Sequence, residues 1–392
     1  MPKREDGVRL LALEPRLLLL FLAIGGPVFL VSALLILGWL RGEMNRTIGD
    51  DMLGGAAVHT ARYLDTYLLN NLTNVSVIAA TPSLRQAVET SNREYTGSAE
   101  VIRERLRRQD QEWVEKRGAL VWALDIVVRD TSDFLREIAT FNPAYDEILL
   151  TDRQGALVAA TNLTTDYYQG DEEWWRSAFG DGEQGAFYMS GVIFDQSAGG
   201  HVLEMAVPVR DVAVPVGDVP SHEFPQVIGV LKVEVRATDL SSVISGVRPG
   251  ETGHALLVDR RDGTVIIGSE AKDVMARKYP GFSRLEETMG GQERSFLTRD
   301  EEGTVWVAGF ARMPEPSPSA YRDWVVLVQQ EADEAHAAMR HATLYLLVFF
   351  VGIGGVILLM SLYLHWKLVR PIREIDLREE MERLGIAESE AR

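Results

Sequence analysis

LLTDRQGALVAAT at residues 149–161 and LLVDRRDGTVIIGS at residues 256–269 follow one pattern: an apolar strand, an Asp-Arg turn, a glycine and a second strand. The second turn is one residue longer, and Asp152 and Asp259 lie 107 residues apart. A repeat at that spacing predicts two copies of a domain-sized unit rather than a solenoid. Two similar hairpins that arose by chance remain the alternative.

Short apolar, β-branched runs between turn residues continue from each hairpin, first as far as Arg236 and then as far as Glu331. Such runs are typical of strands. We therefore predict two modules with mainly antiparallel sheets, a distal one at about 142–248 and a proximal one at about 249–335. Asp211–Pro225, rich in Pro, Gly and Asp, is predicted to be a solvent loop.

The region before the first module, residues 41–141, is predicted to be helical. Leu64, Leu68, Leu72, Val75 and Ala79 recur at steps of four and three, which is one stripe of an α-helix. More helix follows, and a third helix is predicted at 133–140, where Asn142-Pro143 ends it. The predicted fold class is α+β: a long N-terminal helix followed by two tandem PAS-like modules.

Two uncharged apolar runs, Leu17–Leu40 and Thr343–Leu364, are 24 and 22 residues long. Each exceeds the ~20 residues that cross ~30 Å of hydrocarbon, so we predict a transmembrane helix at 17–40 and another at 343–364. The alternatives are a buried core helix for either run and a cleaved signal peptide for the first. The first run is longer than the ~7–15 residues of a signal core, and no A-x-A site follows it.

The charges that flank the two runs predict the orientation. Basic residues beside a span stay in the cytoplasm; they are Lys3, Arg4, Arg9 and Arg16 before the first span and Lys367, Arg370, Arg373 and Arg378 after the second. We therefore expect an inner-membrane protein with cytoplasmic tails at 1–16 and 365–392 and residues 41–342 outside. The charges of the two tails cancel, so the whole net charge of −17 belongs to the exterior. A surface that acidic disfavours nucleic acid as a partner.

Signs of catalysis are poor. The chain has no cysteine, and its seven histidines include no zincin pair. Residues 180–185 fit G-x-G-x-x-G but follow a predicted helix and enter a strand, which indicates a turn rather than a dinucleotide site. We expect no enzymatic activity, no catalytic residue, no resident metal and no cofactor.

The stretch from Asp166 to Leu240 is the most specific part of the chain: DYYQGDEEWWRSAF, then YMSGVIFDQSAGGHVLEMAVPVRD, then IGVLKVEV. Together with the long helix and the tandem modules, it resembles the double Cache sensor domain of bacterial chemoreceptors and sensor histidine kinases. That resemblance implies a transmembrane receptor that binds a small extracellular ligand, with roles in signal transduction such as chemotaxis or a two-component system. We expect a homodimer through the first long helix.

The segment after the second span, LVRPIREI, resembles the start of a HAMP linker, although a full linker needs roughly twice the 26 residues that follow the span. A cytoplasmic signalling partner in trans would supply the output. The alternatives are a membrane-anchored ligand-binding protein without an output of its own and a truncated chemoreceptor or histidine kinase.

The resemblance also implies a ligand site. In amino-acid-binding members, an arginine two residues before the characteristic tryptophan clamps the ligand carboxylate, and downstream acids hold its ammonium. Carried over by position, the candidates here are Glu172, Trp174, Trp175, Asp195 and Glu234. The arginine position is held by Glu172, and the tyrosine usually found two residues before the first acid is Ile193.

An acid cannot donate hydrogen bonds to a carboxylate. Two indoles with up to three carboxylates instead favour a cationic ligand: an amine, a quaternary ammonium, or a metal ion held by oxygens. The alternative is that the tryptophans pack in the core and the acids are surface charges.

Overall fold

The computed structural model describes residues 15–116, 119–182, 185–196, 198–211, 225–268, 274–314, 321–364 and 366. The chain forms two compact units, residues 48–334 and the two chain ends outside that range. The predicted tails, the HAMP-like segment and the predicted loop after Asp211 lie almost entirely outside the described residues.

The unit formed by the chain ends consists of two apolar helices, α1 (Pro15–Arg46) and α11 (Ala337–Leu364). They contain the two predicted spans and pack against each other, with the rings of Phe29 and Phe350 edge to face at 5.9 Å. By length and composition, two helical stretches of the described chain could cross a membrane, one starting at Gly25 and one at Arg340–Met360.

The other unit begins with helices: η1 (Thr47–Leu53), α2 (Gly54–Ala79), α3 (Pro82–Arg93), α4 (Ala99–Lys116), α5 (Val121–Val128) and α6 (Asp130–Phe141). The apolar stripe predicted from Leu64 to Ala79 is buried along α2, which confirms the helix and its inward face. The helix predicted at 133–140 is confirmed as α6, which is a few residues longer and ends at Phe141, with Asn142 as its C-cap.

The first module contains one five-stranded sheet. Its strands are β1 (Tyr145–Asp152), β2 (Leu157–Ala160), β3 (Tyr188–Asp195), β4 (Gly200–Arg210) and β5 (Val227–Arg236). They pair antiparallel in the order β2-β1-β5-β4-β3. Helix α7 (Glu173–Phe179) and the short turn η3 (Gly180–Gly182) precede β3, and α8 (Ala237–Ser245) follows β5.

The second module has a separate six-stranded sheet. Its strands are β6 (His254–Asp259), β7 (Thr264–Ile267), β8 (Val274–Lys278), β9 (Ser295–Arg299), β10 (Val305–Arg312) and β11 (Trp324–Glu331), with helices α9 (Phe282–Met289) and α10 (Ala332–Ala335). The antiparallel order β8-β7-β6-β11-β10-β9 repeats that of the first sheet and adds β8 at one edge. Two separate sheets with the same strand order confirm the predicted tandem architecture.

The matching hairpins also share their turn chemistry. The Asp152 carboxylate accepts hydrogen bonds from the backbone N–H groups of Gln154 and Ala156, at 2.8 and 3.2 Å. In the second hairpin, the Asp259 carboxylate accepts one from the N–H of Arg261 at 2.8 Å. An aspartate that bonds the backbone two residues further on is a common way to start a tight turn. The repeated Asp-Arg pair therefore marks the same turn in both modules.

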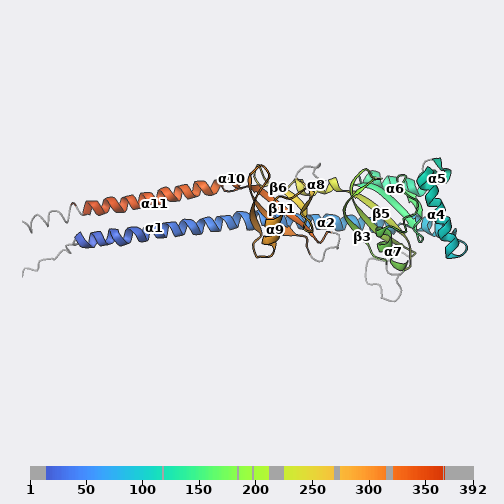
Figure 1. Cartoon of the computed structure of the whole chain (residues 1–392), viewed down its shortest axis with the longest axis horizontal. Coiled ribbons are helices and arrows are strands. Elements are labelled where there is room, and N and C mark those ends of the chain that lie inside the picture. The colour runs from blue at the N-terminus through green and yellow to red at the C-terminus, as the bar shows by residue number, and fades with distance from the viewer. Residues whose placement is uncertain are drawn as a thin grey trace, which may run out of the picture. The chain divides into compact units, whose positions relative to one another are not determined.

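Helix α2 packs on both sheets: it contacts β4 and β5 of the first and β10 and β11 of the second (Figure 1). One polar contact of α2 to the second module comes from the hydroxyl of Tyr321, which donates to Asp65 at 3.0 Å. Near its start, Gly54 lies so close to Gly309 of β10 that a side chain at 309 would meet backbone atoms. One rigid element thus contacts the cores of both modules.

Helix α7 packs on β3, β4 and β5 of the first sheet, and α4 and α5 contribute to the same core cluster. This cluster contains Leu149, Val230, Trp113, Trp174 and Trp175. In β5, Val230, Lys232 and Glu234 alternate with Leu231, Val233 and Val235, so the two charged residues share one face with Val230. Sheet geometry therefore places two charges within an otherwise apolar core.

Candidate ligand site

Three glutamates form a row across the centre of the first sheet. Glu234 of β5 lies directly opposite Glu147 of β1 on one side and opposite Glu204 of β4 on the other. Directly opposed residues of antiparallel strands point to the same face. The three side chains are buried, with exposed fractions of 1%, 0% and 9% for Glu147, Glu234 and Glu204. Like charges in this position repel each other, so the row requires a compensating cation or proton.

Lys232, two residues before Glu234 on β5, supplies one such cation. Its Nζ lies 2.6 Å from Glu234 Oε1 and 3.1 Å from Glu204 Oε1. Burial disfavours the charged ammonium, but the negative charges of Glu234 and Glu204 outweigh burial and raise the pKa of Lys232. Lys232 is therefore protonated at neutral pH.

The same ammonium occupies the face of Trp174. Lys232 Nζ lies 5.1 Å from the centre of the Trp174 ring, within the range of a cation–π interaction. Trp174 is held there by α7, which packs against β4 and β5. The indole that the sequence analysis assigned to a ligand cation thus contacts a cation of the protein itself.

Trp175 faces another part of the core. Its ring stacks on Phe179 at 4.5 Å between centroids, and its Nε1–H donates to the Thr151 hydroxyl at 3.0 Å. Both indoles belong to the buried core of the first module. The structure therefore does not place the two tryptophans together as the walls of one open pocket.

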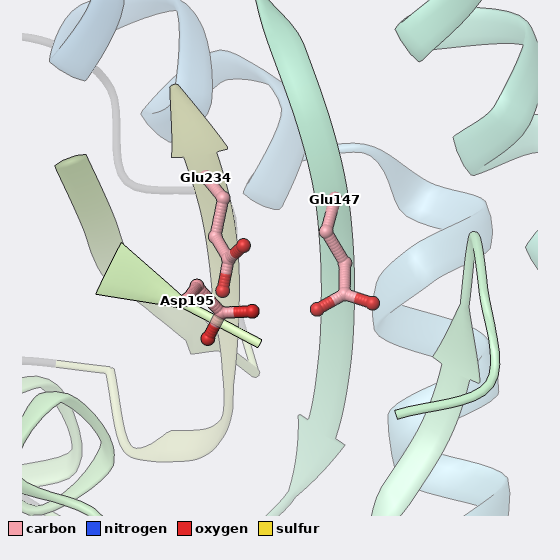
Figure 2. A group of neighbouring side chains, drawn as sticks. All are labelled: Glu147, Asp195 and Glu234. Carbon is pink, nitrogen blue, oxygen red and sulfur yellow. The ribbon is translucent and has the colours of Figure 1, made fainter. Parts of the chain in front are cut away.

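Asp195, the last residue of β3, brings a further carboxylate to the row. One carboxylate oxygen from each of Asp195, Glu147 and Glu234 lies within 4.8 Å of the other two. Figure 2 shows the three carboxylates, from three different strands, turned toward one another. Asp195 is half-buried, and its Oδ1 also accepts a hydrogen bond from the N–H of Ala198 at 2.8 Å. Asp195 and Glu234, both proposed from the sequence, do converge.

The crowding of carboxylates changes the proton affinity of Glu234. Burial raises the pKa of the Glu234 carboxyl to about 7, and the charges of Glu147 and Asp195 act in the same direction, although Lys232 opposes them. At neutral pH this group is therefore divided between its two protonation states. A fully buried carboxyl that ionises near pH 7 is typical of functional sites.

Glu172 lies at the edge of this arrangement. It immediately precedes α7, where its backbone carbonyl accepts the N–H of Arg176 at 3.1 Å, and its side chain is exposed. Partial desolvation raises its pKa, as do the charges of Asp166, Asp171 and Glu204. The interaction with Glu204 puts Glu172 within electrostatic range of the glutamate row.

Glu147, Glu204 and Lys232 were missed by the sequence analysis. The motif GVLKVEV contained a usable signal, because Lys232 and Glu234 sit at alternate positions among residues that are otherwise apolar. Two charges on one face of such a strand indicate a buried ion pair or a site. The register of the strands places Glu147 of β1 and Glu204 of β4 opposite Glu234, and no local sequence pattern indicates that register.

A Cache domain family model matches residues 42–339. The chain belongs to the double Cache family. Among solved structures, this double Cache chain is similar in fold to the ligand-binding domain of the amino acid chemoreceptor PctB of Pseudomonas aeruginosa, which contains L-Arg. The identity is 16%, the match covers 74% of this chain and 98% of that chain, and the TM-score is 0.42.

Two further solved structures are similar to this double Cache chain. The ligand-binding domain of the Pseudomonas fluorescens chemoreceptor CtaA, with L-serine, has 13% identity, coverage of 75% and 99%, and a TM-score of 0.42. That of PctC of P. aeruginosa, with GABA, has 14% identity, coverage of 71% and 97%, and a TM-score of 0.41. At these identities the named ligands are properties of those proteins alone. No curated protein matches the sequence.

The second module of this double Cache chain has a cavity of about 310 Å³. His254, Trp306 and Gln329 line it, together with the basic residues Arg277, Lys278 and Arg299 and the acidic run at 300–302. The basic and acidic residues of this lining are equal in number, so their net charge favours neither a cationic nor an anionic ligand.

Proposed function

We propose that this chain is a two-pass membrane receptor whose first module binds a small cationic or amine-bearing ligand. Both ends lie in the cytoplasm, and the Cache domain lies outside. Membership of the double Cache family and the two flanking apolar helices support this proposal. The role is one of binding and signalling rather than catalysis.

The observation that supports a cationic ligand is the negative charge of the buried carboxylates in the first module. Glu204 and Glu234 pair with the ammonium of Lys232, and the carboxylates of Glu147 and Asp195 lie close to that of Glu234. When all five side chains are ionised, their formal charge is −3. Bringing an anion to that site would add an unpaired buried charge, which costs several kcal/mol. A cation would instead gain charge-assisted hydrogen bonds or coordination.

We infer that a conformational change passes from the first module to the second through α2, which contacts the sheets of both. Helix α2 contacts both sheets, so a shift of β4 or β5 around a ligand changes its packing on β10 and β11. In α10, which follows β11, the Glu334 carboxylate accepts hydrogen bonds from the N–H groups of Glu251 and Thr252, at 2.7 and 3.0 Å. These contacts join the turn that enters the second module to the residues that lead into α11. A coupling of ~1–3 kcal/mol is typical of such transmission.

The ligand class is tested by thermal unfolding of the full-length chain in lipid nanodiscs. The panel contains amines, quaternary ammonium compounds, amino acids, dicarboxylates and divalent cations. We expect a cationic compound to raise the unfolding temperature, and Asp195→Asn to weaken its binding at least tenfold, or about 1.4 kcal/mol. Glu173→Gln, which removes an exposed charge at the start of α7, is the matched control. Tight binding of a dicarboxylate that depends on Asp195 would refute the cationic ligand class.

The topology is tested by reporter fusions. A reporter after Arg392 is expected to behave as cytoplasmic, and one within the predicted loop Asp211–Pro225 as exported. Both reporters on one side of the membrane would refute the two-span receptor.

A further inference from the structure

The carboxylates of Glu147, Asp195 and Glu234 have the geometry of a shared coordination site. Glu147 and Glu234 project from adjacent strands, and Asp195 reaches them from the end of β3 (Figure 2). One oxygen from each lies within 4.8 Å of the others. Ligand oxygens that surround a Ca²⁺ ion at ~2.3–2.6 Å lie at most ~4.6–5.2 Å apart. The three oxygens thus already lie within the span that one such ion bridges.

A second observation is the state of the Glu234 side chain. Its Oε1 accepts from Lys232, whereas its Oε2 is buried and has no hydrogen-bond partner among the described residues. Glu234 is fully buried, and its carboxylate faces the other two. A buried carboxylate oxygen without a donor is unfavourable unless a cation or a proton occupies the space beside it.

The donor set indicates which kind of cation fits. All three side chains offer carboxylate oxygens, and the group contains no imidazole. Oxygen-only sites suit hard cations such as Ca²⁺ and Mg²⁺, whereas zinc sites generally include nitrogen or sulfur ligands. Mg²⁺ needs near-octahedral geometry at ~2.0–2.1 Å, which requires a tighter cluster than Ca²⁺ does.

From the geometry, the buried oxygen and the donor set, we propose that Glu147, Asp195 and Glu234 bind a divalent cation of the calcium type. Water completes the coordination on the side of Asp195, the most exposed of the three carboxylates. Lys232 remains on Glu234 Oε1 and Glu204, so the ion takes Glu234 Oε2. The inference rests on the proposed function in that it names the cation that the first module senses.

Binding is measured by isothermal titration of the full-length chain with Ca²⁺ after removal of divalent ions by a chelator. Nanodiscs of zwitterionic phosphatidylcholine, with empty discs as the blank, avoid Ca²⁺ binding to anionic lipid. We expect one site per chain, an affinity at least tenfold higher for Ca²⁺ than for Mg²⁺, and luminescence of bound Tb³⁺ excited through tryptophan, because Trp174 lies beside Lys232 and Glu234.

Asp195→Asn, Glu234→Gln and Glu147→Gln are each expected to weaken Ca²⁺ binding at least tenfold. Glu173→Gln, an exposed carboxylate on the neighbouring helix, is expected to change it less than twofold. Thermal unfolding in chelator shows which variants remain folded. If the two buried positions do not tolerate substitution, the half-buried Asp195 decides the result.

The outcomes separate this inference from the proposed function. If Ca²⁺ binds no better than to empty discs, or equally to wild type and Asp195→Asn, the metal site is refuted. If an amine binds instead and depends on Asp195, the metal site is refuted while the cationic receptor stands. If neither Ca²⁺ nor any other cation of the panel binds, both proposals fail.

Discussion

The ammonium of Lys232 lies 5.1 Å from the centre of the Trp174 ring and thereby fills the aromatic face with a charge of the protein itself. Its Nζ also holds Glu204 and Glu234 through ion pairs. The Lys232 ammonium therefore already neutralises part of the negative charge that a ligand of the first module would contact. The remaining negative charge lies toward Glu147 and Asp195.

Replacing Lys232 tests its role as the internal counter-ion. Lys232→Met keeps most of the unbranched side chain and removes its charge, which leaves the buried carboxylates without their ammonium. Removal of one partner of a buried pair costs about 3–5 kcal/mol. We expect a loss of that order in the free energy of unfolding, measured by urea titration in detergent.

Arg260→Met provides the comparison. Arg260 pairs with Asp323 at 3.2 Å, and the two side chains are 42% and 36% exposed. Exposed pairs contribute ~0–1 kcal/mol, so this variant is expected to unfold almost as the wild type does. Equal stability of Lys232→Met and Arg260→Met would show that the buried row is neutralised by some other means.

The raised pKa of Glu234 predicts a pH dependence of stability. The folded state holds the proton up to about pH 7, whereas the ordinary value for glutamate is 4.5. Because the folded state binds the extra proton between these values, stability falls as pH rises through this window. The slope contributed by one group is at most about 1.4 kcal/mol per pH unit.

Thermal unfolding in chelator, from pH 4.5 to 8, measures this slope. Glu234→Gln cannot ionise, so its slope in this window is expected to be shallower than that of the wild type. Outside the window the two curves should run parallel. Identical slopes at all pH values would show that another group carries the proton.

The fold could be predicted where its pattern is local. The paired hairpins, the stripe along α2 and the end of α6 before Asn142 depend on neighbouring residues, and each is found as predicted. The sequence analysis gave no bounds for α5, which lies within the region predicted to be helical, and it missed β8. Helix α5, Val121–Val128, is apolar on nearly all sides and shows no clear period, and β8, Val274–Lys278, is a short, charged edge strand.

The site could be predicted only in part, because its members are distant in the chain. Asp195 and Glu234 follow from the family resemblance, and the structure brings them together. Glu147 lies opposite Glu234 through the pairing of β1 with β5, a relationship that no local pattern encodes. Lys232 shows a different limit. The sequence shows that Lys232 is charged, but only the structure shows that its ammonium lies over the ring of Trp174.

Trp175 is predicted to act through packing rather than through ligand contact. Trp175→Phe removes the hydrogen bond from Nε1 to Thr151 and part of the stack on Phe179. A lost hydrogen bond costs about 1 kcal/mol, and the missing ring volume adds to this. We expect the free energy of unfolding to fall by about 1–3 kcal/mol, while the affinity for the cationic ligand changes less than twofold. A tenfold loss of affinity at unchanged stability would instead make Trp175 a ligand contact.

Because α2 lies close to the second module, we predict that one methyl group added at Gly309 strongly lowers the stability of the protein. A Cβ at Gly309 would lie 2.2 Å from the backbone nitrogen of Gly54 and 2.3 Å from the carbonyl carbon of Leu53. Both are backbone atoms, so the start of α2 and β10 must separate to accept Gly309→Ala. Overpacking of this kind costs about 1–3 kcal/mol. Because α2 also contacts the first sheet, we expect weaker transmission as well as lower stability.

Gly246→Ala is the matched control for Gly309→Ala. Gly246 ends α8 with a φ of −73°, and a Cβ there would meet no atom within 4 Å. A glycine in a conformation open to alanine gains about 0.4–1 kcal/mol on substitution, because the unfolded chain becomes less flexible. Thermal unfolding of the two variants in nanodiscs should therefore move in opposite directions. If Gly309→Ala unfolds at or above the wild-type temperature, the contact between Gly54 and Gly309 is not a tight one, and α2 does not couple the two modules through it.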